Sequence, residues 1–286
     1  MDNPLVSIII PTYNRPDLLQ RAVKSALEQT VEDFEVIVVD DASPQPVTLP
    51  EHPKLRIIRQ TVNKRGAAAR NAGILAARGQ WITFVDDDDQ MLPHLVEVSL
   101  AALEKTDLPK PVGVLSGIEV IDADGKITAT RLPPTLPKGK HFGLEPITAG
   151  QSFFCKQTLV VEREVLLEIG GFDESFSSRV HTELFLRLNQ VCSILGLPIV
   201  TYQLFSHSGP RVSRNPSLRQ KNFKRLIHKH ESLFKAHPKM FARFVYEHAL
   251  NSYEVGQNLA AISHVFWAMR IHPRYTLSRV TKEFRK

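Results

Sequence analysis

The sequence has little cysteine and no long apolar run. Its two cysteines, Cys155 and Cys192, lack the spacing of a metal site or a redox motif, which excludes a disulfide-stapled protein. The apolar residues 5–10 are too few for a membrane span or for the core of a secretory signal. Asp2 stands before them, where a signal would carry basic residues. We therefore expect a cytoplasmic protein with reduced cysteines and no signal peptide.

The charge of the chain is unevenly distributed, although 43% hydrophobic and 23% charged residues are ordinary for a soluble globular protein. Residues 211–286 hold 16 Lys and Arg against 4 Asp and Glu, whereas the preceding 210 residues hold 20 against 26. Such a basic tail is typical of a solvated helical face or of a segment that contacts an anionic membrane. It carries no nucleic-acid-binding motif. We thus expect no nucleic-acid partner, and membrane association at the inner face is the alternative to a freely soluble protein.

Apolar, β-branched runs alternate with segments of helical periodicity over the first 90 residues. Strands that are apolar throughout and alternate with helices predict an α/β fold with a mostly parallel sheet, flanked by helices on both faces. The predicted strands are residues 6–10, 34–39, 55–58 and 81–85, and the predicted helices are residues 17–29 and 67–77.

The second half of the chain shows weaker patterns. Beyond Pro216 the periodicity is helical to the end. We therefore predict a catalytic domain over residues 1–215 and a basic helical extension over residues 216–286. Within the first domain we predict a strand over residues 112–121, a turn at 122–125, a loop at 132–144, helices over 160–169 and 182–195, and a strand over 199–205.

Polar side chains follow three of the predicted strands, at Thr12-Tyr13-Asn14, Asp40-Asp41 and the run of four aspartates at residues 86–89. Because ligands bind beyond the carboxyl ends of parallel strands, we expect these clusters to converge. Adjacent carboxylates repel one another, and Mg²⁺ and Mn²⁺ prefer such oxygen ligands. The run therefore predicts a divalent cation site, with a solvated acidic loop as the alternative.

Four motifs in the first 90 residues occur in a characteristic order: VSIIIPTYNR, QTVEDFEVIVVDDAS, NKRGAAARNAGILAARG and WITFVDDDD. With GGFDESF and ELFLRL farther on, the sequence resembles the family-2 glycosyltransferases over about its first 215 residues. The resemblance implies a GT-A fold and a metal-dependent, inverting transfer of a sugar from a nucleotide-diphosphate sugar to an acceptor hydroxyl. Mn²⁺ or Mg²⁺ is the implied cofactor. UDP is the commonest donor nucleotide, with GDP and dTDP as alternatives, and the acceptor is a saccharide or lipid-linked molecule of cell-surface polysaccharide or glycolipid assembly.

The resemblance also assigns roles to individual residues. Tyr13 stacks on the base, Asp41 accepts its hydrogen bonds, and Asp88 closes the Asp-x-Asp motif as the principal metal ligand. His207 completes the metal site. The implied donor nucleotide-binding residues are Pro11, Thr12, Tyr13, Asn14, Asp41, Arg70, Asp86, Asp87 and Arg211.

The catalytic base is where the sequence departs from the family pattern. Val180 and His181 stand where the family usually carries an acidic pair. An imidazole with an ordinary pKa of about 6.5 can take the proton of the attacking hydroxyl. His181 is therefore the predicted base, and Glu183, two residues later, is the alternative.

Two other classes of protein explain part of the pattern. A nucleotide-binding protein that has lost its base predicts binding of nucleoside diphosphate without sugar transfer. A nucleotidyltransferase also uses carboxylate-bound metal, but it requires a glycine-rich loop after the first strand, and PTYNRPD contains no glycine.

Overall fold

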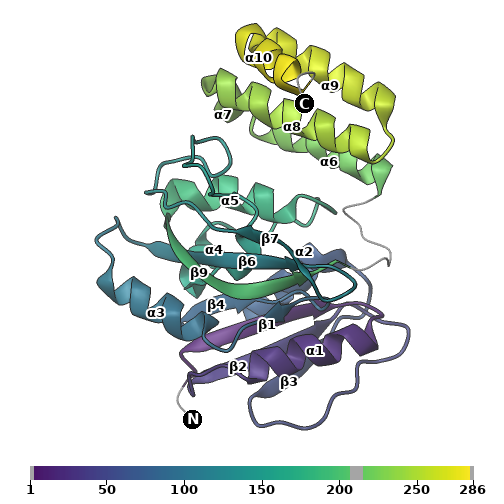
Figure 1. Cartoon of the computed structure of the whole chain (residues 1–286). Coiled ribbons are helices and arrows are strands. Elements are labelled where there is room, and N and C mark those ends of the chain that lie inside the picture. The colour runs from purple at the N-terminus through teal and green to yellow at the C-terminus, as the bar shows by residue number, and fades with distance from the viewer. Residues whose placement is uncertain (1–2, 207–214, 284–286) are drawn as a thin grey trace. The chain divides into compact units, whose positions relative to one another are not determined.

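The computed structural model describes residues 3–206 and 215–283 (Figure 1). The chain divides into two compact units, one of Met1–Phe142 with Ile147–Gly209 and one of Gly143–Pro146 with Pro210–Lys286. The predicted boundary after residue 215 stays a prediction, because it follows directly on residues outside the described part.

The first sheet of the larger unit has the strand order β3-β2-β1-β4-β8. The first four strands are parallel, and only β8 runs antiparallel to its neighbour β4. This arrangement confirms the predicted α/β fold with a mostly parallel sheet. The strands are β1 (Val6–Thr12), β2 (Phe34–Asp40), β3 (Leu55–Arg59), β4 (Trp81–Phe84) and β8 (Val161–Glu162), and the first helices are α1 (Pro16–Leu27) and α2 (Arg65–Ala76).

Helices cover the sheet, so the central strands are buried on both faces. Every residue of β1 and β2 is buried, as the continuous apolar runs predict. Gly73 lets α2 approach β1 closely, because a Cβ at this position would lie 2.4 Å from Cγ2 of Ile9. Close packing of this kind holds α2 against the middle of β1.

A second sheet has the order β5-β9-β6-β7. Its strands are β5 (Gln90–Met91), β9 (Ser193–Phe205), β6 (Val112–Ile121) and β7 (Ile127–Arg131). The predicted turn between β6 and β7 is confirmed, with Gly125 at a φ of 79° and its amide donating to the carbonyl of Asp122. Because β4 belongs to the first sheet and β5 to the second, residues 86–89 connect the two sheets.

Two of the helices predicted after residue 159 differ from the structure. Residues 161–162 form β8 before α4 (Arg163–Glu168) begins, and α5 (Val180–Val191) ends earlier than its periodicity predicts. Ser193 and Ile194 pair in parallel with Val112 and Gly113, so pairing with β6 takes this apolar stretch into β9. The remaining helices of this unit are α3 (Leu95–Lys105) and the 3₁₀ turn η1 (Lys156–Thr158).

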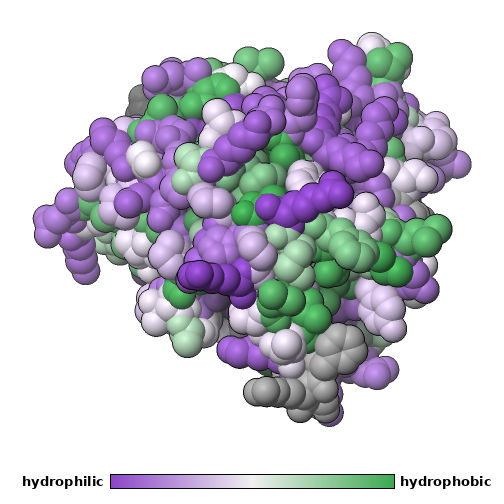
Figure 2. All heavy atoms as spheres, turned by 90° about the horizontal axis from the view of Figure 1, so that it is seen from above, coloured by the Kyte–Doolittle hydropathy of each residue, from purple (hydrophilic) through white to green (hydrophobic). Residues whose placement is uncertain are grey.

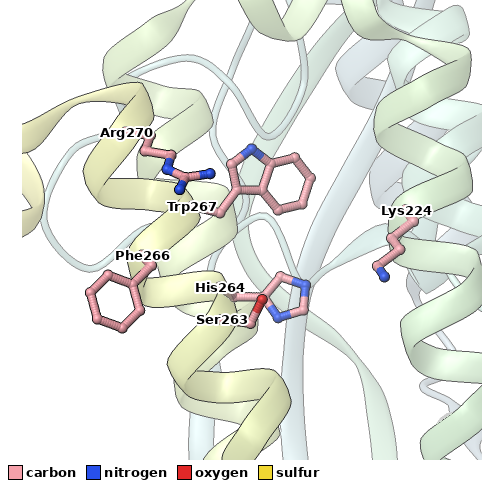
Figure 3. A pocket seen from close by; sticks show the side chains of 6 residues that line it. All are labelled: Lys224, Ser263, His264, Phe266, Trp267 and Arg270. Carbon is pink, nitrogen blue, oxygen red and sulfur yellow. The ribbon is translucent and has the colours of Figure 1, made fainter.

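The second unit contains α6 (Pro216–Lys229), α7 (Glu231–Ala236), α8 (Pro238–Glu254), α9 (Asn258–Ile271) and α10 (Pro273–Glu283). Aromatic rings form its core, with Phe223 stacked 3.7 Å from His248. A hollow of about 460 Å³ opens between α6 and α9 (Figure 3). It is lined by Lys224, Ser263, His264, Phe266, Trp267 and Arg270. Across the described residues, no helix is both long and apolar enough to cross a bilayer.

Candidate active site

The four consecutive aspartates divide into two groups. Carboxylate oxygens of Asp86, Asp88 and Asp89 all lie within 4.8 Å of one another. Asp87 instead joins β1, because the hydroxyl of Thr12 donates to its Oδ2 at 2.8 Å and Arg15 donates to its Oδ1 at 2.9 Å. Three carboxylates thus form an acidic cluster, while the fourth fixes the loop to the first strand.

Asp89 anchors this cluster to the second sheet. The hydroxyl of Tyr202 donates to its Oδ2 at 3.0 Å, and the amide of Phe205 donates to its Oδ1 at 3.0 Å. The same hydroxyl oxygen accepts from the amide of Asp86 at 3.2 Å. Burial, followed by the charges of Asp86 and Asp88, raises the pKa of Asp89 well above its usual range.

This donor set fits a hard divalent cation. All three members offer carboxylate oxygens, the ligands that Mg²⁺ and Mn²⁺ prefer, and a cation relieves the repulsion among them. Two guanidinium groups also reach the cluster: Arg15 donates to Oδ2 of Asp88 at 3.0 Å, and Arg21 donates to the carbonyl of Asp88 at 2.5 Å.

The loops after β1 and β2 meet next to this cluster. The amide of Asp41 donates to the carbonyl of Thr12 at 2.9 Å, and the amide of Asn14 donates to Oγ of Ser43 at 2.9 Å. Tyr13 is 45% exposed, which leaves its ring open to a ligand. Pro11, in contrast, is buried within β1. The predicted convergence of the first two polar clusters is therefore confirmed.

Asp41 is held by backbone amides. Its Oδ1 accepts from the amide of Lys64 at 2.8 Å and its Oδ2 from that of Arg65 at 2.6 Å. Burial raises the pKa of this carboxyl group, against the effect of the two amides. Each carboxylate oxygen retains a second lone pair, so the clamp orients Asp41 without using up its capacity as an acceptor.

Arg70 brings α2 to the acidic cluster. Its buried guanidinium forms an ion pair with Asp86 and also donates to the carbonyl of Gly66 at 3.0 Å. Burial alone raises the pKa of Asp86, but Arg70, with smaller contributions from His181 and Arg15, brings that pKa below its usual value. Asp86 is therefore a carboxylate at neutral pH.

His181 lies in the first turn of α5, and both it and Arg70 lie next to Phe172. Its ring meets that of Phe172 edge-on, with 5.5 Å between centroids. Burial and then the Arg70 cation lower the pKa of His181 to about 3, against the opposing effect of Asp86. Within residues 3–206 and 215–283, neither ring nitrogen makes a hydrogen bond. The structure thus presents a neutral imidazole beside the acidic cluster.

Glu183 has a different environment, in the interior of the unit. Its side chain is 0% exposed, and Arg187 donates to both carboxylate oxygens, at 2.8 and 2.6 Å. Arg187 also donates to the carbonyls of Ile169 and Gly171, at 2.5 and 2.8 Å. This pair joins α5 to the turn that follows α4.

Two predicted residues, His207 and Arg211, lie outside the described residues. The structure also adds two residues that the sequence did not single out. Arg15 lies in the YNRPD motif, and Tyr202 gave no signal because a buried tyrosine in a strand is usually a core residue.

Comparisons with known proteins identify the family to which the chain is similar. The family model described as Glycosyl transferase family 2 matches residues 7–169. The chain is 42% identical over 106 residues to the putative colanic acid biosynthesis glycosyl transferase WcaA of Escherichia coli, covering 35% of this chain and 38% of that protein. It is 27% identical over 222 residues to an uncharacterized glycosyltransferase of Haemophilus influenzae, covering 76% of this chain and 74% of that one.

Among solved structures, residues 1–349 of TarS from S. aureus, in complex with UDP-GlcNAc, superpose with a TM-score of 0.65 at 18% identity. The superposition covers 95% of this chain and 82% of that chain, and it shows a shared GT-A fold. Because the family model spans more than half of the chain, the protein belongs to glycosyl transferase family 2.

Proposed function

We propose that the protein is a metal-dependent, inverting glycosyltransferase that moves a sugar from a UDP-sugar to an acceptor hydroxyl in polysaccharide or glycolipid assembly. The observation that carries the proposal is the meeting of three carboxylates with a neutral imidazole beside the Thr12–Asp41 loops. The UDP-GlcNAc complex of TarS supports the donor class. WcaA and the succinoglycan biosynthesis protein ExoO of Rhizobium meliloti, which is 35% identical over 127 residues, support the acceptor class.

Each part of the site has a role in this reaction. Tyr13 stacks on the base, and Asp41 accepts hydrogen bonds from the base or ribose. Asp86, Asp88 and Asp89 would hold the cation, which would supply positive charge against the leaving diphosphate. Arg70 keeps Asp86 ionised.

His181 takes the proton from the acceptor hydroxyl. Its neutral ring is the base form, and the Asp86 carboxylate stabilises the imidazolium that results. A base with a pKa of about 3 is weak, and the Asp86 carboxylate is the neighbouring group that raises this pKa. Attack from the face opposite the leaving group gives inversion.

A donor-hydrolysis screen tests this proposal. The full chain is incubated with UDP-, GDP- and dTDP-sugars, with Mn²⁺, with Mg²⁺ and with neither, and release of nucleoside diphosphate is measured. We expect release from a UDP-sugar only when a divalent cation is present. Binding of UDP without hydrolysis or transfer of any donor would instead support a catalytically degenerate nucleotide-binding protein.

We also propose that the α6–α9 face contacts an anionic membrane, where a lipid-linked acceptor resides. Leu259, Ile262 and Phe266 recur at helical spacing on α9 and are 87%, 55% and 66% exposed. The hollow beside them places Lys224 and Arg270 on either side of Trp267 (Figure 3), and neither α6 nor α9 contains an acidic residue. Seen from above, apolar side chains reach the surface in several places between hydrophilic ones (Figure 2). Exposed apolar side chains next to cations are typical of helices that lie in a membrane interface.

Co-sedimentation with vesicles of phosphatidylglycerol and phosphatidylcholine measures this contact. Replacing both Ile262 and Phe266 by serine is expected to weaken binding roughly 10-fold or more, because each side chain loses its apolar burial. The matched control is Tyr253→Ser, which removes an equally exposed ring from α8. Binding that is absent, or that is equal for vesicles without anionic lipid, would refute the contact.

A further inference from the structure

An exposed phenyl ring in the larger unit is flanked by two cations. Phe154 is 60% exposed, in the loop before η1. Cζ of Arg131 lies 5.6 Å from the centroid of its ring, and Nζ of Lys156 lies 5.3 Å from it. The ring thus offers an apolar face with a guanidinium and an ammonium group at its sides.

Within residues 3–206 and 215–283, no carboxylate forms an ion pair with either cation. Among the same residues, Lys156 donates only to the carbonyl of Phe153, at 2.6 Å. Burial, together with Arg179 and Arg131, lowers the pKa of Lys156 to about 8. Because partly buried cations are unfavourable without a counter-charge, the cluster is suited to an anion.

Strand register places this cluster near the acidic cluster. Arg131 on β7 pairs with Ile118 on β6, which in turn pairs with Tyr202 on β9. Adjacent strands are about 4.8 Å apart, so the backbones of Arg131 and Tyr202 are separated by roughly 10 Å. The hydroxyl of Tyr202 contacts both Asp86 and Asp89.

Side-chain packing places Lys156 near the predicted base as well. Nζ of Lys156 lies 5.4 Å from the ring of Phe142, which lies 4.5 Å from the ring of Phe185. Phe185 follows His181 by one helical turn, on the same face of α5. The Lys156 cation also acts electrostatically on His181.

We propose that Phe154, Arg131 and Lys156 form an acceptor subsite for a saccharide that carries an anionic group. The apolar face of the sugar ring packs on Phe154, and the guanidinium and ammonium groups bind a phosphate or carboxylate of the acceptor. The subsite rests on the proposed sugar transfer, because it names the class of acceptor that this site would take.

Binding of small probes to the full chain tests the subsite. Glucose 6-phosphate, glucuronate and glucose are titrated separately, with binding followed by saturation-transfer NMR and calorimetry. We expect at least one charged sugar to bind about 10-fold more tightly than glucose, as a charge-assisted hydrogen bond predicts. The order of the two charged sugars distinguishes phosphate from carboxylate.

Variants identify the residues responsible. Arg131→Gln and Lys156→Gln, singly and together, are expected to remove the preference for charged sugars, whereas Phe154→Ala weakens all three probes. Lys126→Gln is the matched control, because it removes an exposed cation from the same β6–β7 hairpin. Thermal unfolding verifies that each variant folds, and Arg131→Gln alone suffices if the half-buried Lys156 does not tolerate replacement.

Competition with UDP separates this subsite from the donor site. We expect the charged sugar to bind in the presence of saturating UDP and cation. Displacement by UDP would assign the cations to the donor diphosphate, and equal affinity for glucose would exclude an anion site, so either result overturns the proposal. If the unmodified protein does not bind UDP at all, this result would instead count against the proposed transferase function.

Discussion

Replacement of Asp88 by alanine is expected to lower sugar transfer about 100- to 1,000-fold, the effect of removing one preorganised group that stabilises transition-state charge. Asp88 belongs to the three-carboxylate cluster, so its loss removes a ligand from the proposed cation site. The same variant should bind Mn²⁺ at least 10-fold more weakly. Direct Mn²⁺ binding, followed by electron paramagnetic resonance, measures this effect independently of activity.

Asp87→Asn is the matched control for this prediction. It removes the same charge from the adjacent position, but Asp87 bonds to Thr12 and Arg15 and lies outside the cluster. We expect it to keep its Mn²⁺ affinity. Chelation of divalent cations should abolish transfer by the unmodified protein, and added Mn²⁺ or Mg²⁺ should restore it. Full activity of Asp88→Ala, or an equal loss of Mn²⁺ affinity in Asp87→Asn, would contradict the assignment.

Replacement of His181 by alanine is expected to lower kcat about 100- to 10,000-fold, the usual contribution of a general base. Binding of UDP should change little, because the residues proposed to hold the nucleotide are on other elements. Single-turnover kinetics and UDP titration of the same samples separate the two effects. Normal transfer by His181→Ala would show that another group accepts the proton.

The pH profile gives a second readout for His181. Its pKa of about 3 in the free protein means that the ring becomes protonated, and loses its basic form, only as the pH falls towards 3. The pH profile of kcat/KM reflects the free enzyme. If the unmodified protein shows a decline in kcat/KM near pH 6.5, we therefore expect His181→Ala to show the same decline, because His181 does not titrate there. A decline that disappears in His181→Ala would mean that the ring titrates near its ordinary pKa, which would contradict this prediction.

Glu183→Gln distinguishes the two candidate bases. The pair of Glu183 with Arg187 is buried, so breaking it should lower stability by about 3 kcal/mol or more, measured by urea unfolding. If the pair of Glu183 with Arg187 serves only to join α5 to the adjacent turn, the folded Glu183→Gln variant should still transfer sugar. A selective loss of kcat without loss of stability would make Glu183 the base instead.

The sequence predicted the first sheet well, because its strands are buried on both faces and therefore apolar throughout. Residues 34–39 and 55–58 lie within β2 and β3, and the polar ends of β1 and β2 meet as expected. The second sheet was predicted less completely. β5 and β8 are two residues each, too short for a periodic pattern, and β9 begins where pairing with β6 competes with the helical pattern of α5.

The sequence predicted which types of residue form the site more successfully than how these residues are arranged in space. The aspartate run predicted a cation site, but periodicity does not reveal which carboxylates converge, since this depends on where Thr12 and Tyr202 lie. The proximity of Arg131 to Phe154 depends on a hairpin and a loop that are 23 residues apart in the chain. Such contacts follow from tertiary structure alone.

The four side chains of residues 86–89 make different contacts, and these contacts determine which changes in chain length the segment tolerates. Three of its side chains are directed to the cluster and one to the first strand, while both flanks are fixed by pairing in different sheets. Inserting or deleting a single residue would shift every carboxylate by one place, so that strand anchors and ligands would exchange positions. A single substitution changes the contacts of one aspartate, whereas a change of register would displace all four side chains at once.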